Sequence, residues 1–507
     1  MARSPSSSPV LGEEVELSAS RRPGRAGVSR RALLGGLGAA LGGFTSVARS
    51  APPASSGDPD PSSMLGTLVQ RITFGPNEHE TGLINTLGYG GYIEHHLNHA
   101  AIPDYGMGTI LAPFTTLSMT PSQLYELPPN QVATELIDAT LQRAYYSKRQ
   151  LFERMVEFWS DHFNIDINFA HCRWLKTVDD REVIRPHALG RFGDLLRASA
   201  HSPAMLYYLD NALSVGTAPI ENYSRELFEL HTLGTEVGYS QRDVYEAARC
   251  LTGWTVYPTS AGPSLSGRFL YRHEWHDPGE KRVFGHIFPA GGGQEEGETL
   301  LTMLAEHPAT ATRVARKLCR RFLGEGVSER IVESVASVYR STGGDIKAMM
   351  RRVLLPQHMA QATPRYKRPM HAYISALRAA RGNLLSTGVL RSQLNLAGHL
   401  PFNWGPPDGY PDANETWSGL ILPRWNFAAQ LAAGELPGLH LDVAGFFAGL
   451  ATAEEMTARI VTLIFGGRMA PKDRDVIREY LGDDPVPLSR QREALGLALS
   501  SPGFQWY

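Results

Sequence analysis

Fourteen residues near the middle of the chain, Glu221–Gly234 (ENYSRELFELHTLG), carry three glutamates, an arginine, an asparagine and a histidine. On a helical wheel of about 100° per residue, Asn222, Glu226 and Glu229 cluster on one flank. His231 lies on the opposite flank, about 140° from Glu226 by the same geometry. The three flank residues could bind a divalent cation if another segment supplied a histidine or an aspartate. Alternatively, Arg225 neutralises its glutamate neighbours at i±4, and the segment is a structural salt-bridge network.

Two further segments contain histidines that could complete such a site. His162, in EFWSDHF, continues an apolar helix face, where a core histidine is the competing interpretation. His276 and Asp277 lie in a predicted loop, HEWHDPGE, which could equally be a structural turn network. Asp161 falls on the same helix flank as Glu153 and Glu157, and we expect it to be solvated. The predicted catalytic residues are Glu226, Glu229, Arg225, His231 and Asp277, and the predicted ligands of a divalent metal are His162, Asn222, Glu226 and His276.

A stiff aromatic loop, Pro401–Trp417 (PFNWGPPDGYPDANETW), is the remaining candidate. Its prolines and the Asp408-Gly409 pair are turn formers. Trp404, Tyr410 and Trp417 could form a platform that stacks on sugar rings or other flat ligands, or they could cap a core.

The elements that must position these residues are mostly helices. Helical periodicity is continuous over Asn130–Phe163, and further helices are predicted over Ile220–Leu233 and Pro308–Leu323, among others. Strand signals are limited to 268–272 and 281–287, which we expect to pair as one small β-hairpin. The predicted fold is mainly α: a large multi-helical globular unit with one hairpin near residues 268–287.

Composition excludes several classes of protein. The 507 residues are 42% hydrophobic and 20% charged, and the formal net charge is −2. The overall charge therefore gives no reason to expect binding to nucleic acid. The basic run Arg313–Arg321 is expected to be a solvated helix face. The three cysteines are far apart and show neither a CxxC motif nor the spacing of zinc ligands. This spacing disfavours covalent haem attachment, iron–sulfur clusters and zinc sites built from cysteine. The chain also lacks the motifs of serine esterases, P-loop nucleotide-binding proteins, Rossmann dehydrogenases and HExxH metalloproteases.

The N-terminus predicts export. A basic region precedes the apolar run Ala32–Phe44, which is too short to cross a bilayer, and small residues follow it. The pair Arg30-Arg31 resembles a twin-arginine signal. We therefore predict a signal peptide over 1–50, a disordered linker over 51–63 and one helical unit over 64–507. The mature chain would contain no transmembrane segment and would be periplasmic or extracellular.

Ten motifs resemble the domain-of-unknown-function-1800 family of exported bacterial proteins. They run from QRITFGP to SSPGFQ and include FWSDHF, ENYSRELFELHTLG, HPATATRVARKLCRRF, KRPMHAYISALRA and PPDGYPDANETW. The resemblance covers roughly residues 64–507 and implies a mostly helical extracytoplasmic protein with no established activity. It also implies a partner, since members are often encoded beside sulfatase-like exported proteins. Ile220 stands where the family pattern has an asparagine.

Three functions are compatible with these observations. The first is metal-dependent or acid–base hydrolysis of an envelope or extracellular polymer. The second is non-catalytic binding of a sulfatase-like partner or a glycan. The third is transport of noncovalent haem through an axial histidine.

Overall fold

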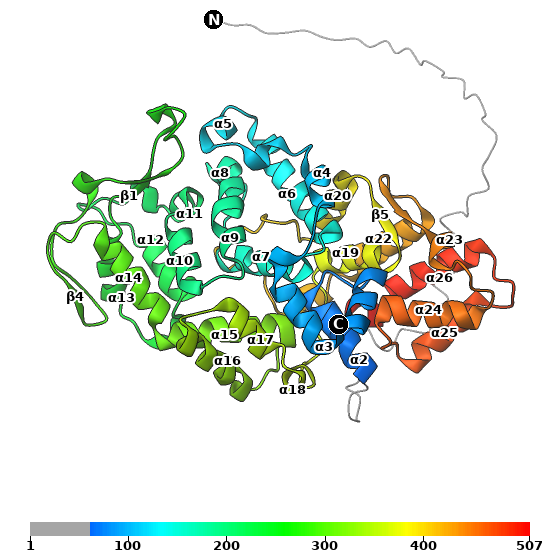
Figure 1. The fold of residues 1–507 in the computed structure, drawn as a ribbon. Coiled ribbons are helices and arrows are strands. Elements are labelled where there is room, and N and C mark those ends of the chain that lie inside the picture. Colours follow the sequence, from blue (N-terminus) through cyan, green and yellow to red (C-terminus); the bar gives the residue numbers. More distant parts are fainter. Residues whose placement is uncertain (1–60) are drawn as a thin grey trace, which may run out of the picture.

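The computed structural model describes residues 61–507 as a mainly helical protein with three small two-stranded sheets in that range (Figure 1). The mainly α prediction is confirmed. The predicted signal peptide and most of the predicted linker lie outside the described residues, and helix α2 begins at Pro61, within the last residues of that linker. Within the described range, no helix has the length and apolar character required to cross a membrane.

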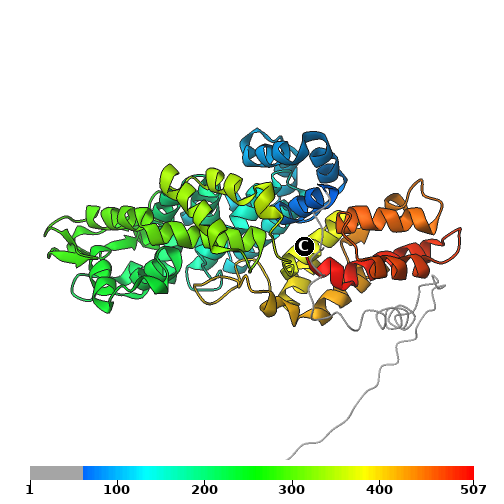
Figure 2. The same cartoon turned by 90° about the horizontal axis from the view of Figure 1, so that it is seen from below.

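Two hydrophobic cores lie along the long axis of the molecule (Figure 2). Most helices before residue 360 contribute to the first: α2 (Pro61–Ile72), α3 (Glu78–Leu97), α7 (Gln150–His162), α8 (Cys172–Asp179), α10 (Phe192–Ala200), α11 (Pro203–Tyr208), α12 (Asn222–Glu226), α13 (Gln241–Cys250), α14 (Glu295–Glu306), α15 (Pro308–Leu323), α16 (Glu329–Thr342), α17 (Ile346–Val353) and α18 (Pro356–Met359). The other helices in this part of the chain contribute none of its buried side chains: α4 (Gly106–Leu111), α5 (Pro121–Tyr125), α6 (Pro129–Tyr146) and α9 (Arg185–His187).

The second core is formed mainly by the C-terminal helices and by one face of α6. These helices are α19 (Pro369–Ala379), α20 (Thr387–Leu396), α22 (Ile421–Ala433), α23 (Val443–Phe446), α24 (Ala453–Phe465), α25 (Pro471–Leu481), α26 (Leu488–Ser500) and α27 (Pro502–Gln505). The short helix α21 (Asn414–Ser418) contributes Trp417 to a separate small cluster. Strands β5 (Gly382–Leu384) and β6 (Leu439–Leu441) pair antiparallel beside them.

The single helix predicted over Asn130–Phe163 is wrong, because the chain breaks between α6 and α7. Ser147 adopts an extended backbone, and its hydroxyl donates to the Asp104 carboxylate at 2.7 Å. The same carboxylate accepts the Lys148 N–H at 3.1 Å, and the Ser147 hydroxyl accepts the Arg149 N–H at 3.0 Å. These side chains satisfy backbone groups that a continuous helix would otherwise pair. The break directs α7 between the two cores.

The helix predicted over Ile220–Leu233 is also interrupted. After α12 the chain forms a π-helical turn, η6 (Leu227–His231), and a second π-helical turn, η4 (Asp180–Ile184), lies before α9. A π-turn contains more residues than an α-turn, so a wheel drawn at about 100° per residue misplaces the side chains that follow Glu226. His231 is consequently buried, with 1% of its surface exposed.

The strands near 268–287 pair differently from the predicted hairpin. β1 (Trp254–Val256) pairs antiparallel with β2 (Phe269–Tyr271), and β3 (Lys281–Val283) with β4 (His286–Phe288). Between β3 and β4, Phe284 and Gly285 both have positive φ, 50° and 79°. Two such residues form the tight turn that closes a two-residue hairpin. This local pairing leaves 269–271 to pair with the earlier strand.

Candidate functional site

Helix α7 presents a row of three carboxylates toward the boundary between the cores. Glu153, Glu157 and Asp161 are spaced at i, i+4 and i+8, so they share one face. The expectation that this flank is solvated is wrong: the Asp161 side chain is only 16% exposed, and the other two are more buried. The position of α7 between the cores explains the burial.

Four arginines bind Glu157 and Asp161 together with Asp412 from the aromatic loop, whereas Glu153 pairs with Arg185 at 2.6 Å. Arg321 of α15 reaches Asp161 at 2.8 Å and Asp412 at 3.0 Å. Arg368 contacts the same two aspartates, and Arg365 donates to Asp412 at 2.9 Å. The ion-pair network, as we call it, consists of Glu157, Asp161, Asp412, Arg154, Arg321, Arg365 and Arg368. Arg321 is 2% exposed, so the prediction that 313–321 forms a solvated face is wrong at this residue.

The network keeps two carboxylates ionised in spite of their burial. Burial alone would raise the pKa of Glu157, but Arg154, Arg321 and Arg368 hold it below its ordinary value. Burial opposes ionisation of Asp412 too, and its arginine partners hold its pKa well below the ordinary value. At neutral pH both groups are therefore acceptors of hydrogen bonds and cannot donate a proton.

This electrostatic arrangement predicts acid lability. Because Glu157 and Asp412 have depressed pKa values when folded, their stabilisation is complete above their unfolded values, about 4.3 and 3.9. It is lost as the pH falls through those values toward the lower folded ones. We expect the melting temperature to hold between pH 7 and 5 and to fall steeply between pH 5 and 3. A melting temperature that is constant down to pH 3 would contradict this account.

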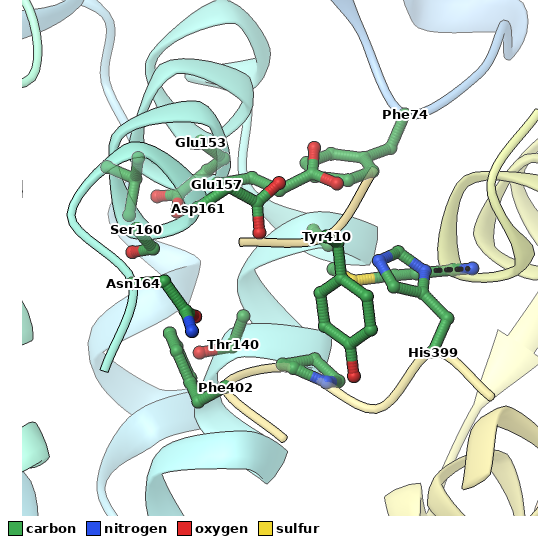
Figure 3. A pocket seen from close by; sticks show the side chains of 14 residues that line it. Phe74, Thr140, Glu153, Glu157, Ser160, Asp161, Asn164, His399, Phe402 and Tyr410 are labelled. Atoms are coloured by element: carbon green, nitrogen blue, oxygen red, sulfur yellow. Dashed lines mark hydrogen bonds between the residues drawn. The ribbon is translucent and has the colours of Figure 1, made fainter. Parts of the chain in front are cut away.

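A cleft opens directly beside the carboxylate row (Figure 3). It encloses about 520 Å³, part of which is open to solvent. One wall is α7, and the opposite wall comes from the segment before and within the aromatic loop. The lining residues are Phe74, Thr140, Ala144, Glu153, Val156, Glu157, Ser160, Asp161, Asn164, Met370, His399, Pro401, Phe402 and Tyr410. The cleft lies where the two cores meet, a common place for ligand sites.

The polar groups of the cleft include hydrogen-bonding capacity that the protein does not use. In the described part of the chain, the Ser160 hydroxyl and Glu157 Oε1 are buried without a hydrogen-bond partner. His399 Nδ1 accepts the Met370 N–H at 3.1 Å, which leaves the ring proton on Nε2. Burial holds the pKa of His399 well below its ordinary value, so the ring is a neutral donor. The cleft thus combines the ionised Glu157 carboxylate, a hydroxyl and an imidazole N–H with aromatic surfaces.

The aromatic loop mainly covers a small core. This is the second of the two interpretations made from its sequence, the first being a stacking platform. Tyr410 and Trp417 are 6% and 2% exposed and pack with Tyr366. Trp404 lies half-buried against Tyr410, with ring centroids 5.0 Å apart. Of the three predicted platform residues, Tyr410 lines the cleft and Trp404 and Trp417 do not. The Asn164 amide fixes the loop by donating to the carbonyls of Trp404 and Pro406.

The Glu221–Gly234 segment, the first candidate site from the sequence, lies outside this cleft. Arg225 pairs with Glu221 at 2.9 Å and approaches Glu229 at 3.9 Å, as the structural interpretation predicts. The Asn222 amide donates to Asp210 at 3.3 Å. Glu226 differs from its neighbours: burial, Glu229 and Asp408 together raise its pKa. The raised pKa makes Glu226 a poorer metal ligand, because a ligand carboxyl group must be ionised.

The predicted histidines occupy three separate surroundings. The His162 ring packs among aromatic side chains and donates from Nε2 to the His231 carbonyl at 3.1 Å. His276 lies between the Thr252 carbonyl and Glu296, and Asp277 binds Arg249 through both carboxylate oxygens. In residues 61–507, no three histidine, cysteine, aspartate or glutamate side chains group as a metal site. His162, Asn222, Glu226 and His276 therefore do not converge.

Sequence reasoning missed Asp412, Arg321 and Arg368, which complete the network. All three lie in motifs that carry the family resemblance: PPDGYPDANETW, HPATATRVARKLCRRF and KRPMHAYISALRA. The sequence does contain a signal for these residues, because each is a charged residue among apolar and aromatic ones. Charged side chains are rarely buried unless they are paired, so this pattern predicts buried ion pairs.

Comparison with known proteins agrees with the resemblance. The family model described as "Protein of unknown function (DUF1800)" matches residues 67–506, nearly the whole described chain. No curated protein and no solved structure matches the chain.

Proposed function

Because the chain belongs to the DUF1800 family, whose members are described as proteins of unknown function, we propose a function from its cleft: it binds a polyhydroxylated ligand, a glycan chain outside the cytoplasm. The observation that carries the proposal is the cleft between α7 and the 399–410 segment. It places three carboxyl groups, among them the ionised Glu157, and an unpaired hydroxyl opposite aromatic side chains.

This combination matches the chemistry of a sugar. Hydroxyl groups of a sugar donate well to carboxylates, and charge-assisted bonds of this kind are stronger than neutral ones. The flat C–H face of a sugar ring packs on aromatic side chains such as Tyr410 and Phe402. The depressed pKa of Glu157 makes it a weak base, which favours binding over proton transfer at this site.

Ser160→Ala tests the proposal with little structural disturbance, since the Ser160 hydroxyl has no partner in the described chain. We expect calorimetric affinity for β-linked glucose or N-acetylglucosamine oligosaccharides to fall about 2- to 12-fold, the equivalent of one hydrogen bond. Ser337→Ala, at an exposed position of helix α16, is the control and should bind as wild type. Wild-type protein that binds no oligosaccharide would refute the proposal.

The raised pKa of Glu226 favours a second candidate, acid–base hydrolysis of the same class of polymer. Burial and the neighbouring carboxyl groups of Glu229 and Asp408 raise the pKa of Glu226, and a raised pKa favours the protonated form that a general acid requires. Glu226→Gln should then abolish polymer cleavage and leave the melting temperature within a few degrees of wild type. If the variant cleaves normally, or if wild type cleaves nothing, Glu226 belongs to the salt-bridge surroundings of Arg225 and the second candidate is removed.

The remaining expectations are also proposals. Twin-arginine export is supported by the N-terminal sequence and is tested by locating the processed protein in cell fractions. Pull-down with a sulfatase-like partner tests the accessory role. An absorption spectrum and elemental analysis of the purified protein test for haem and for a divalent metal.

A further inference from the structure

The α7 cleft offers a ligand only some of its polar groups, because the protein itself uses the others. The Asn164 amide donates to two backbone carbonyls of the aromatic loop. The hydroxyls of Tyr410 and Thr140 also donate to backbone carbonyls, at 2.7 and 2.9 Å. The carboxylates of Glu153 and Asp161 are bound to arginines. These lining residues hold the shape of the cleft and have little hydrogen-bonding capacity left for a ligand.

The polar groups that remain are one donor, one acceptor and one hydroxyl. His399 carries its proton on Nε2, because Nδ1 accepts the Met370 N–H, and Nε2 points into the cleft (Figure 3). On α7, Glu157 Oε1 and the Ser160 hydroxyl are buried without hydrogen-bond partners in the described chain. A buried polar atom without a partner is destabilising, so a ligand that supplies the partner gains affinity.

Direct contacts hold the two walls of the cleft together. The Arg368 guanidinium binds the Asp161 carboxylate of α7 and donates to the Tyr410 carbonyl of the aromatic loop at 2.7 Å. Its Nη1 also lies 3.8 Å from Glu157 Oε1. The Tyr410 ring packs at right angles to the His399 ring, with centroids 4.5 Å apart. A ligand between the walls can therefore bond to groups of both at once.

Most of the remaining lining is apolar, including the side chains nearest to these polar groups. Phe74 lies beside Glu157, since the Arg154 guanidinium pairs with that carboxylate and covers the Phe74 ring at 5.1 Å. Met370 lies beside His399, to which its N–H is bonded, and both apolar side chains line the cleft. A hydroxyl group placed against them would lose water without gaining a partner, whereas a methyl group would gain from burial.

We propose that the cleft selects a 2-acetamido sugar, an N-acetylated hexosamine within a glycan chain, over a sugar with a hydroxyl group at the same carbon. The acetamido carbonyl accepts from His399 Nε2, and its N–H donates to Glu157 Oε1. Its methyl group packs on Phe74 and Met370. A hydroxyl group is too short to reach both walls, so one buried polar group would stay unpaired. This inference rests on the proposed function, because it names the class of sugar that the same cleft binds.

Calorimetry with two β-linked oligosaccharides of equal length, one of N-acetylglucosamine and one of glucose, tests the selectivity. We expect wild type to bind the acetylated chain at least about tenfold more tightly, because a site built for polar partners rejects a ligand that lacks them. His399→Asn removes the Nε2 donor and places an amide oxygen near Nδ1, where it can accept the Met370 N–H. It should lower the ratio of the two affinities to below about threefold, since one hydrogen bond is lost from the acetylated chain alone.

Ser160→Ala is the matched control, because the Ser160 hydroxyl bonds to a ring hydroxyl that both chains carry. This variant should weaken both complexes by similar factors and keep the wild-type ratio. Wild type that binds the two chains equally would overturn the selectivity and leave the proposed function standing. Wild type that binds neither chain would overturn both. A ratio that falls as much in Ser160→Ala as in His399→Asn would also contradict the assignment of the donor to His399.

Circular dichroism checks that His399→Asn is folded. If it does not fold, a third ligand decides with wild type: the acetylated chain after N-deacetylation, in which an amine replaces each acetamido group. This chain lacks the carbonyl acceptor and the methyl group, so we expect it to bind more weakly than the acetylated chain. Equal or tighter binding of the deacetylated chain would mean that the carboxylate alone selects the ligand, and would overturn the proposal.

Discussion

Replacing Asp412 with asparagine is expected to lower the free energy of unfolding by about 3–5 kcal/mol, the range for removing one charged partner of a buried ion pair. Asp412 accepts from Arg321, Arg365 and Arg368, and each of these arginines is at most 3% exposed. An amide cannot compensate three guanidinium groups, so positive charge would remain buried beside α7. Chemical denaturation of wild type and variant measures the difference.

An exposed ion pair supplies the control. Glu94 and Arg351 form a short pair at 2.7 Å, but both side chains are about half exposed. Glu94→Gln should therefore cost less than about 1 kcal/mol, as surface pairs do. Equal losses for Asp412→Asn and Glu94→Gln would mean that the network is not buried as described.

Gly409→Ala is expected to have a comparable effect through the backbone. Gly409 has φ +75°, and an added Cβ would lie 2.0 Å from the Asp161 carbonyl oxygen. The left-handed conformation costs about 1–2 kcal/mol for alanine and the overlap about 1–3 kcal/mol, which together give about 2–5 kcal/mol. Because Tyr410 and Asp412 follow directly, the shift should also weaken oligosaccharide binding in the cleft.

Gly405→Ala in the same loop is the matched control. Its ideal Cβ meets no atom within 4 Å, and the side chain position is exposed. This variant should unfold within about 0.5 kcal/mol of wild type. If Gly409→Ala behaves like Gly405→Ala, the loop does not rest on α7 and the cleft has a different wall.

Local chemistry made much of the fold predictable. The helix Pro308–Leu323 was predicted with both bounds correct, because proline occupies its first position and His307 caps it by accepting the Ala309 N–H. The long helix over 130–163 failed because Asp104, distant in sequence, binds the backbone at Ser147 and Lys148. The π-helical turn after Glu226 likewise has no signal in a periodicity that assumes 3.6 residues per turn.

The cleft was less predictable, because its parts meet only in the folded chain. Glu153, Glu157 and Asp161 were placed on one face correctly, but their burial depends on arginines from α15 and from the start of α19. His162 was predicted as a candidate ligand, and the turn of α7 directs it into the aromatic core while Asp161 faces the network. The spacing of residues within one helix does not predict which of its flanks becomes buried when the helix packs against a second core.

The most direct test of the proposed function is a crystal structure of the protein with a bound β-linked oligosaccharide. The account predicts a sugar ring between the α7 carboxylates and Tyr410, with a ring hydroxyl bonded to Ser160. An oligosaccharide bound elsewhere, or a cleft that stays free of sugar at saturating concentration, would contradict it.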